Sequence, residues 1–193
     1  MEHDRLTRAA QLYIRAKDVA PLPPERSRPF RTKLELATEQ LRWLRPWVES
    51  AFVQRWVVVD GGYAKKPFLR PAKQDGWVVT SRLRKDAALW SVPEVIPPHE
   101  RSPGRPPIYG KRRIALAKRA GHKRGWQQVQ CVQYGETVTK TIKTFLATWR
   151  PAGGVIRVVL VQEEDGWVAF FCADPQATPE EILEAMADRS ALE

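Results

Sequence analysis

Four strand-like runs joined by very short turns constrain the fold of this chain more than any other feature of its sequence. The runs are rich in Val, Ile, Thr, Phe and Trp, and they cover residues 126–134, 137–149, 154–162 and 166–173. The turns between them contain Gly, Pro, Asp and Glu and leave no room for a crossover, so neighbouring runs pair as antiparallel hairpins. The second half of the chain therefore predicts an antiparallel sheet.

Three helices are predicted outside the regions of strand-like sequence, each from its own signal. Thr32 and Glu35 form a capping-box pattern at the start of a helix over residues 33–53, in which Pro46 is expected to cause a kink. The other two predicted helices are a basic one over residues 5–17, which an extended Pro-rich connector over 20–31 follows, and one from Thr178 to Glu193, with Pro179 and Glu181 in its first turn.

The first half of the chain also holds two short strands separated by a helix. A β-branched run from Arg55 stops at Asp60, which two glycines follow. A helix over residues 65–74 and a second strand over 76–83 come next. The order strand, helix, strand predicts a parallel pair, so this half of the chain is α/β in character.

The positive charge of the chain is concentrated in one segment. The 193 residues carry a formal net charge of +10, and residues 98–125 hold nine Lys or Arg and one acid, a net +8. Such a segment attracts phosphates through long-range Coulomb forces and counterion release, which favours nucleic acid as the partner. The alternative is a solvated basic loop with no specific partner.

Several classes of protein are excluded by the composition. With 43% hydrophobic residues the chain has the means to bury a core, and its longest apolar run, Trp167 to Ala173, is far too short to span a membrane. The charged first residues contain no signal-peptide core, which favours the cytoplasm. Cys131 and Cys172 form no CxxC pair and are expected to be buried, reduced thiols, so no zinc site is predicted.

Two places in the sequence carry candidate catalytic chemistry. Asp60 follows a buried strand, where open α/β sheets bind their ligands, and the glycines after it leave room for a metal ion or a phosphate. The alternative is ordinary turn formation by Asp-Gly. Arg189 and Glu193 are four residues apart and share one face of the final helix, where a surface ion pair is the simpler explanation.

The ordered motifs VVVDGGYAKKPFL, TSRLRKDAALW, FCADP and EILEAMADRSALE resemble bacterial insertion-sequence transposases of the DDE class. The resemblance covers roughly residues 33–193. Asp60 with Tyr63 matches the family's second catalytic element, and Arg189 with Glu193 matches the third, although Met186 stands where the family has Tyr. The resemblance implies an α/β, ribonuclease-H-like (retroviral-integrase-like) core that an antiparallel β insertion interrupts.

The resemblance also implies a chemistry and a set of partners. Two Mg²⁺ ions, or Mn²⁺ in their place, would be held by Asp60 and Glu193 for DNA cleavage at transposon ends and strand transfer into target DNA. The parent enzyme would act as a homodimer, without a membrane or a small-molecule substrate. Expected DNA contacts are Arg189, Tyr63, Arg82, Arg84, Lys111, Arg112, Arg113 and Trp126, with Trp149 as the competing tryptophan.

The sequence departs from the family pattern at its start, where a strand with the first catalytic Asp is expected before the helix over 33–53. The core is therefore expected to be incomplete at the N-terminus, and this chain alone is expected not to cleave DNA. Two alternatives remain: a non-catalytic, basic nucleic-acid-binding protein that interferes with a full-length transposase, and an independent nuclease that uses Asp174 beside Asp60. The predicted domains are 1–31, 32–90, 91–173 and 174–193.

Overall fold

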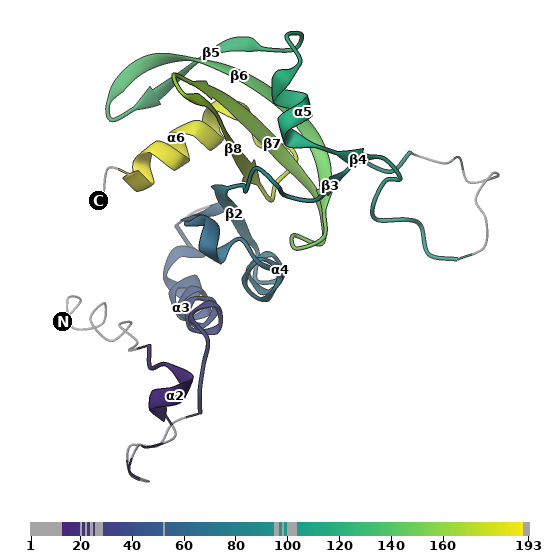
Figure 1. Cartoon of the computed structure of the whole chain (residues 1–193). Coiled ribbons are helices and arrows are strands. Elements are labelled where there is room, and N and C mark those ends of the chain that lie inside the picture. The colour runs from purple at the N-terminus through teal and green to yellow at the C-terminus, as the bar shows by residue number, and fades with distance from the viewer. Residues whose placement is uncertain are drawn as a thin grey trace. The chain divides into compact units, whose positions relative to one another are not determined.

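A computed structural model of the chain describes residues 13–19, 21, 23, 25, 29–51, 53–94, 97, 99 and 104–190. The chain divides into two compact units, residues 1–55 and residues 56–193 (Figure 1). Each unit is described by itself. None of the described helices has the length and apolar character that crossing a membrane requires.

The first unit contains a short helix, α2 (Ala16–Val19), and a longer one, α3 (Lys33–Val48). The predicted capping box is confirmed, because the Glu35 backbone N–H donates to Thr32 Oγ1 and the Thr32 N–H donates to the Glu35 carboxylate. α3 ends two residues after Pro46, so the predicted extension to residue 53 is wrong. Most of the helix predicted over 5–17 lies outside the described residues.

The second unit is built on one eight-stranded sheet with the order β1-β2-β8-β7-β6-β3-β4, in which β5 also pairs with β6. The predicted hairpins are confirmed, since β5–β6, β6–β7 and β7–β8 all pair antiparallel. The strands are β1 (Arg55–Val59), β2 (Trp77–Arg82), β3 (Leu89–Trp90), β4 (Arg113–Ile114), β5 (Gln127–Gln133), β6 (Glu136–Trp149), β7 (Gly154–Glu163) and β8 (Gly166–Cys172).

β1 and β2 are neighbours whose carboxyl ends lie at the same edge of the sheet. A methyl group added to Gly61, just after β1, would lie 3.4 Å from the carbonyl oxygen of Arg82 at the end of β2. Neighbouring strands whose carboxyl ends coincide run parallel, as the strand, helix, strand order predicts. The crossover between them contains helix α4 (Lys66–Gln74), and the result is a mixed α/β unit with a mostly antiparallel sheet.

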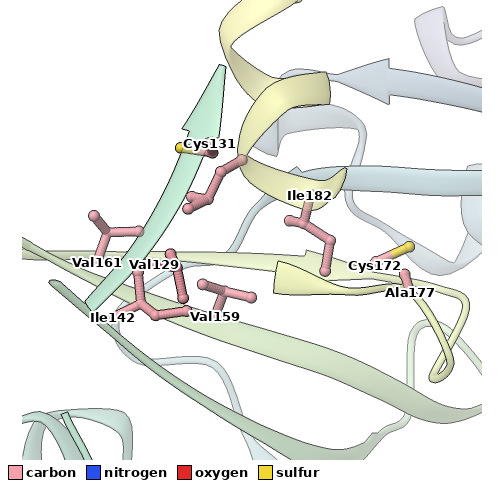
Figure 2. Packing of buried hydrophobic residues seen from close by; sticks show 9 residues of the cluster. Val129, Cys131, Ile142, Val159, Val161, Cys172, Ala177 and Ile182 are labelled. Atoms are coloured by element: carbon pink, nitrogen blue, oxygen red, sulfur yellow. The ribbon is translucent and has the colours of Figure 1, made fainter. Parts of the chain in front are cut away.

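One face of the sheet, called here the α6 face, is covered by helix α6 (Pro179–Ser190). Ile182 points from α6 toward the strands that carry Val159 and Cys172 (Figure 2). The predicted start of α6 is confirmed, since the Glu181 N–H donates to Thr178 Oγ1 at 3.2 Å. Glu184 of α6 also accepts a hydrogen bond from the backbone N–H of Val132 in β5, at 2.9 Å.

The opposite face, called here the α5 face, carries the short helix α5 (Leu116–Gly121). Lys143 and Phe145 of β6 point to this side, because they alternate with Ile142, which packs on the α6 face. α5 and α6 lie on opposite sides of the sheet (Figure 1). The sequence did not predict α5, since six residues, LAKRAG, within a basic segment show too little periodicity.

Candidate functional site

Asp60 stands exposed directly after β1 and shapes the turn that follows. Its Oδ1 accepts a hydrogen bond from the Gly62 backbone N–H at 2.8 Å and so caps a short 3-10 turn over Gly61–Tyr63. The turn chemistry weighed from the sequence is therefore present. Because no other bond to the carboxylate occurs within the described part of the chain, the second oxygen, Oδ2, faces solvent and can take a ligand.

Tyr63 closes this turn and packs its ring edge-on against Phe68 of α4, with 5.8 Å between the ring centroids. Phe68 is fully buried, so this contact fixes the turn to the first residues of α4. Tyr63 is half-buried, and its role as a DNA contact stays a prediction. Its observed role is to hold the loop that begins at Asp60.

The partner expected for Asp60 cannot be placed, because Glu193 lies outside the described residues. Arg189 is described and lies half-buried on α6. Across the described residues, no group of three or more His, Cys, Asp or Glu side chains is placed to hold a metal ion. Asp60 fits a hard divalent cation as one oxygen ligand, but the described residues do not complete a metal site.

Asp174, the alternative carboxylate for a site beside Asp60, lies near the amino end of β2, whereas Asp60 lies near its carboxyl end. The backbone N–H of Ala173 donates to the Val79 carbonyl at 2.8 Å, before β2 ends at Arg82. At about 3.3 Å per strand residue, this puts Ala173 roughly 10 Å and Asp174 roughly 13 Å along β2 from the end where Asp60 lies. The prediction for Asp174 is therefore wrong, and the cause is that β8 runs antiparallel to β2.

Arg82 and Arg84 both lie exposed near the carboxyl end of β2, but they differ in their partners. The guanidinium of Arg84 donates two hydrogen bonds to Asp86, at 2.9 and 2.8 Å. This pairing lowers the pKa of the Asp86 carboxyl, and the predicted contact of Arg84 with DNA would have to compete with it. Lys85, which stands between Arg84 and Asp86 in the sequence, places its ammonium 4.9 Å from the ring centroid of Trp167.

The basic segment is held in place by close backbone packing. Gly110 donates its N–H to the Ser91 carbonyl at 2.9 Å, and Ser91 donates its own to the Arg112 carbonyl at 2.8 Å. β4 then pairs with β3, which joins the segment to β6. Lys111 and Arg113 are exposed beside this anchor, so the predicted DNA contacts stand on an ordered support.

A groove of about 780 Å³ lies between this anchor, α5 and β6. Among the residues that the structure describes, no carboxylate lines it. Its basic lining comes from three separate parts of the chain: Arg112, Arg113, Lys118, Arg119, Lys123, Arg124 and Lys143. The sequence predicted Arg112 and Arg113 as individual contacts and the whole basic segment over residues 98–125 as a binding region for nucleic acid, but it did not predict Lys143, which lies on a strand outside that segment.

Lys143 fixes one wall of this groove from below. It is only 5% exposed, and its ammonium donates hydrogen bonds to the carbonyls of Arg119 and His122, at 2.9 and 2.7 Å. These carbonyls close the C-terminal end of α5, where a cation is favourable. Burial, and then the charge of Arg119, lowers the pKa of the Lys143 ammonium. Arg119 itself lies 4.1 Å above the ring of Phe145.

The two candidate tryptophans have different environments. Trp149 is 8% exposed and packs against Phe171 with 5.0 Å between ring centroids, so it belongs to the core. Trp126 is half-buried under the Lys143 ammonium, 4.8 Å from its ring centroid. Trp126 also lines a second hollow of about 350 Å³, together with Trp167 and two residues of the groove, His122 and Lys123.

Comparison with known protein families gives one match. Residues 7–152 match the sequence model of a family described as "DDE superfamily endonuclease". The matched segment contains Asp60, Tyr63, the basic segment and α5, and it ends just after β6. No curated protein matches the chain.

Proposed function

Because this chain belongs to the DDE superfamily of endonucleases, we propose that it is part of the catalytic domain of a transposase that cleaves DNA at transposon ends with metal ions and transfers the strands, and that it does not cleave DNA by itself. Its mixed α/β unit with a mostly antiparallel sheet fits the ribonuclease-H-like fold of such nucleases. DNA is the substrate class of the superfamily. The transposon ends, the target DNA, a homodimeric parent and a place in the bacterial nucleoid are parts of the proposal.

The placement of Asp60 is the observation that carries this proposal. An exposed carboxylate stands within the matched segment, at the carboxyl end of a strand, with Oδ1 held by the turn and Oδ2 open. Carboxylate oxygens are the ligands that Mg²⁺ and Mn²⁺ prefer. Asp60 would supply one such oxygen to an ion that polarises a DNA phosphate. Glu193 as a second ligand and Arg189 as a phosphate contact belong to the same proposal.

Manganese binding tests the role of Asp60 separately from catalysis. We expect the unsubstituted chain to bind Mn²⁺ weakly, as followed by electron paramagnetic resonance. We expect the Asp60→Asn variant to lose this binding. The Asn side chain still accepts the Gly62 N–H, so the turn is kept while the charge is removed. Asp86→Asn is the matched control, because Asp86 is also exposed but is paired with Arg84. Equal Mn²⁺ binding by the Asp60→Asn variant and by the unsubstituted chain would contradict the proposal.

A second candidate function is a DNA-binding protein without catalysis. It is favoured by the basic groove, whose cations are in place without any metal ion, whereas the described residues place no group of three or more His, Cys, Asp or Glu side chains that could hold a metal at Asp60. The two functions differ in one measurable respect. DNA binding that persists in EDTA, together with no Asp60-dependent Mn²⁺ binding, would favour the second candidate.

A further inference from the structure

We propose that a DNA backbone lies across the α5 face, anchored in the basic groove beside α5 and passing Lys123, Trp167 and Lys85 toward Asp60. The groove would be an anchoring site separate from the edge that carries Asp60. The inference rests on the proposed function in taking DNA as the polyanion. The inference goes beyond the proposed function because it names the surface that binds DNA, the boundaries of that surface and the residue that orders the groove.

The groove concentrates positive charge that no acid neutralises. Elsewhere some arginines pair with neighbouring acids, as half-buried Arg45 does with Glu49 at 3.1 Å and exposed Arg84 with Asp86 at 2.8 Å. In the groove, by contrast, exposed Lys118, Lys123 and Arg124 lie together without a carboxylate in its described lining. Like charges held at one site repel each other, and a phosphate backbone relieves that repulsion while releasing its own counterions.

The groove is also ordered without a ligand. Lys143 binds the carbonyls of Arg119 and His122, and Arg119 stacks on Phe145, so the C-terminal half of α5 is attached to β6. The turn after α5 includes Gly125 with a φ of +87°, a conformation that suits glycine. A site whose walls are fixed before binding loses little conformational entropy when DNA arrives.

Continuity of the surface toward Asp60 is shown by shared residues. His122 and Lys123 line both the groove and the second hollow, and Trp167 is a wall of that hollow. The ammonium of Lys85 lies over Trp167, and Lys85 follows the end of β2 beside the loop that begins at Asp60. A row of cations therefore runs along this face from β6 to β2.

The length of this row suits several nucleotides. β1 and β6 are separated by β2, β8 and β7, which makes four strand spacings. At about 4.8 Å each, the row spans roughly 19 Å, or about five to six base pairs at 3.4 Å per step. A duplex anchored at α5 would thus present a phosphate about half a helical turn away to the edge that carries Asp60.

Binding of a fluorescein-labelled 20-base-pair duplex in EDTA, followed by anisotropy, tests the groove. The triple variant Lys118→Ala, Lys123→Ala and Arg124→Ala removes three exposed charges from it. We expect at least about tenfold weaker binding, and a slope of log K against log salt that is smaller by about 2.7. Circular dichroism and thermal unfolding establish that the variant is folded.

The matched control removes three exposed lysines on other elements, through Lys17→Ala, Lys33→Ala and Lys73→Ala. We expect it to weaken binding less than about threefold, because the same loss of net charge then acts only at a distance. Equal losses in the two triple variants would overturn the proposal, since they would show attraction to net charge alone.

Site-directed crosslinking tests the path. Cys131 and Cys172 are buried, so a single introduced cysteine can be labelled with an azidophenacyl photocrosslinker. Crosslinks to the duplex are expected from Lys118→Cys and Lys85→Cys, and none from Lys73→Cys. A crosslink from Lys118→Cys without one from Lys85→Cys would overturn the path toward Asp60.

Failure of this inference can be told apart from failure of the proposed function. The groove triple variant is expected to keep the Asp60-dependent Mn²⁺ binding, and Asp60→Asn to keep DNA affinity within about twofold in EDTA. Loss of DNA binding in Asp60→Asn under these conditions would contradict two separate sites.

Discussion

Lys143 shows how one buried charge orders a binding surface that it does not itself expose. Its ammonium is withdrawn from solvent, yet two carbonyls and the face of Trp126 surround it. A buried cation is tolerated when its hydrogen bonds are satisfied in this way. Lys143 therefore shapes the groove through its hydrogen bonds to buried backbone carbonyls and not through a charge exposed to solvent.

Replacing Lys143 by methionine tests this role. Lys143→Met keeps a side chain of similar length but leaves the carbonyls of Arg119 and His122 without their donor. We expect the free energy of unfolding to fall by about 1–3 kcal/mol in urea denaturation, and DNA binding to weaken as α5 loosens. Lys140→Met, at a half-buried position on the same strand, is the control and should change the free energy of unfolding by less than about 0.5 kcal/mol. Unchanged stability in Lys143→Met would contradict this role.

The two cysteines are expected to be inert in the folded chain. Burial is the main cause that raises the pKa of the Cys172 thiol, and it raises that of Cys131 as well. A raised pKa means that the thiols contribute stability fully below their unfolded pKa of about 8.5, and that this contribution is lost as the pH rises through the folded pKa.

Ellman's reagent checks this expectation at pH 8. Neither thiol should react in the native chain, and both should react in guanidinium. Lys118→Cys should add one fast-reacting thiol, which shows that the reagent reaches the surface. Rapid reaction of two thiols in the folded, unsubstituted chain would contradict the burial of Cys131 and Cys172.

At the scale of elements, the pairing of β3 with β4 attaches the basic segment to the sheet. Gly110 is the tightest point of this attachment, because a methyl group there would lie 2.2 Å from Ser91 Oγ and 2.3 Å from the Ser91 carbonyl oxygen. The backbone oxygen cannot move aside as a flexible side chain can. The segment must shift when this position carries a side chain.

We therefore expect Gly110→Ala to lower the free energy of unfolding by about 1–3 kcal/mol and to weaken DNA binding. Gly121→Ala is the matched control, because nothing lies within 4 Å of a methyl group at that glycine. At the end of α5 it should be neutral or slightly stabilising. Urea denaturation measures both variants, and equal stabilities would show that the segment is not anchored at Ser91.

At the scale of the whole molecule, the described residues bring Asp60 to the end of β1 but form no group of three or more His, Cys, Asp or Glu side chains that could hold metal ions. Metal-dependent phosphodiester cleavage needs two ions, each with its own ligands. With supercoiled plasmid and Mg²⁺, we expect the purified chain to show no nicking that depends on Asp60. Nicking that disappears in Asp60→Asn would contradict this expectation and show a complete site.

Sequence patterns predicted local structure well and the assembly of the site poorly. Alternation and turn residues predicted β5 to β8 within one or two residues, and capping residues predicted the starts of α3 and α6. The basic groove joins β4, α5 and β6, whose contacts depend on the pairing of two-residue strands that leave no periodic signal. Asp174 was misplaced for a similar reason, because strand direction decides which edge a residue reaches.

The bond between Glu184 and the Val132 N–H has a consequence for self-association. Among the strands that the structure describes, β5 pairs with β6 alone, so its other side is an open edge on which a strand of a second molecule could add. Such an addition would have to displace the carboxylate, and a hydrogen bond to a charged group contributes about 1.5–3 kcal/mol. Helix α6, which packs on the core, thus also makes the open edge of β5 a poorer template for the addition of a second molecule.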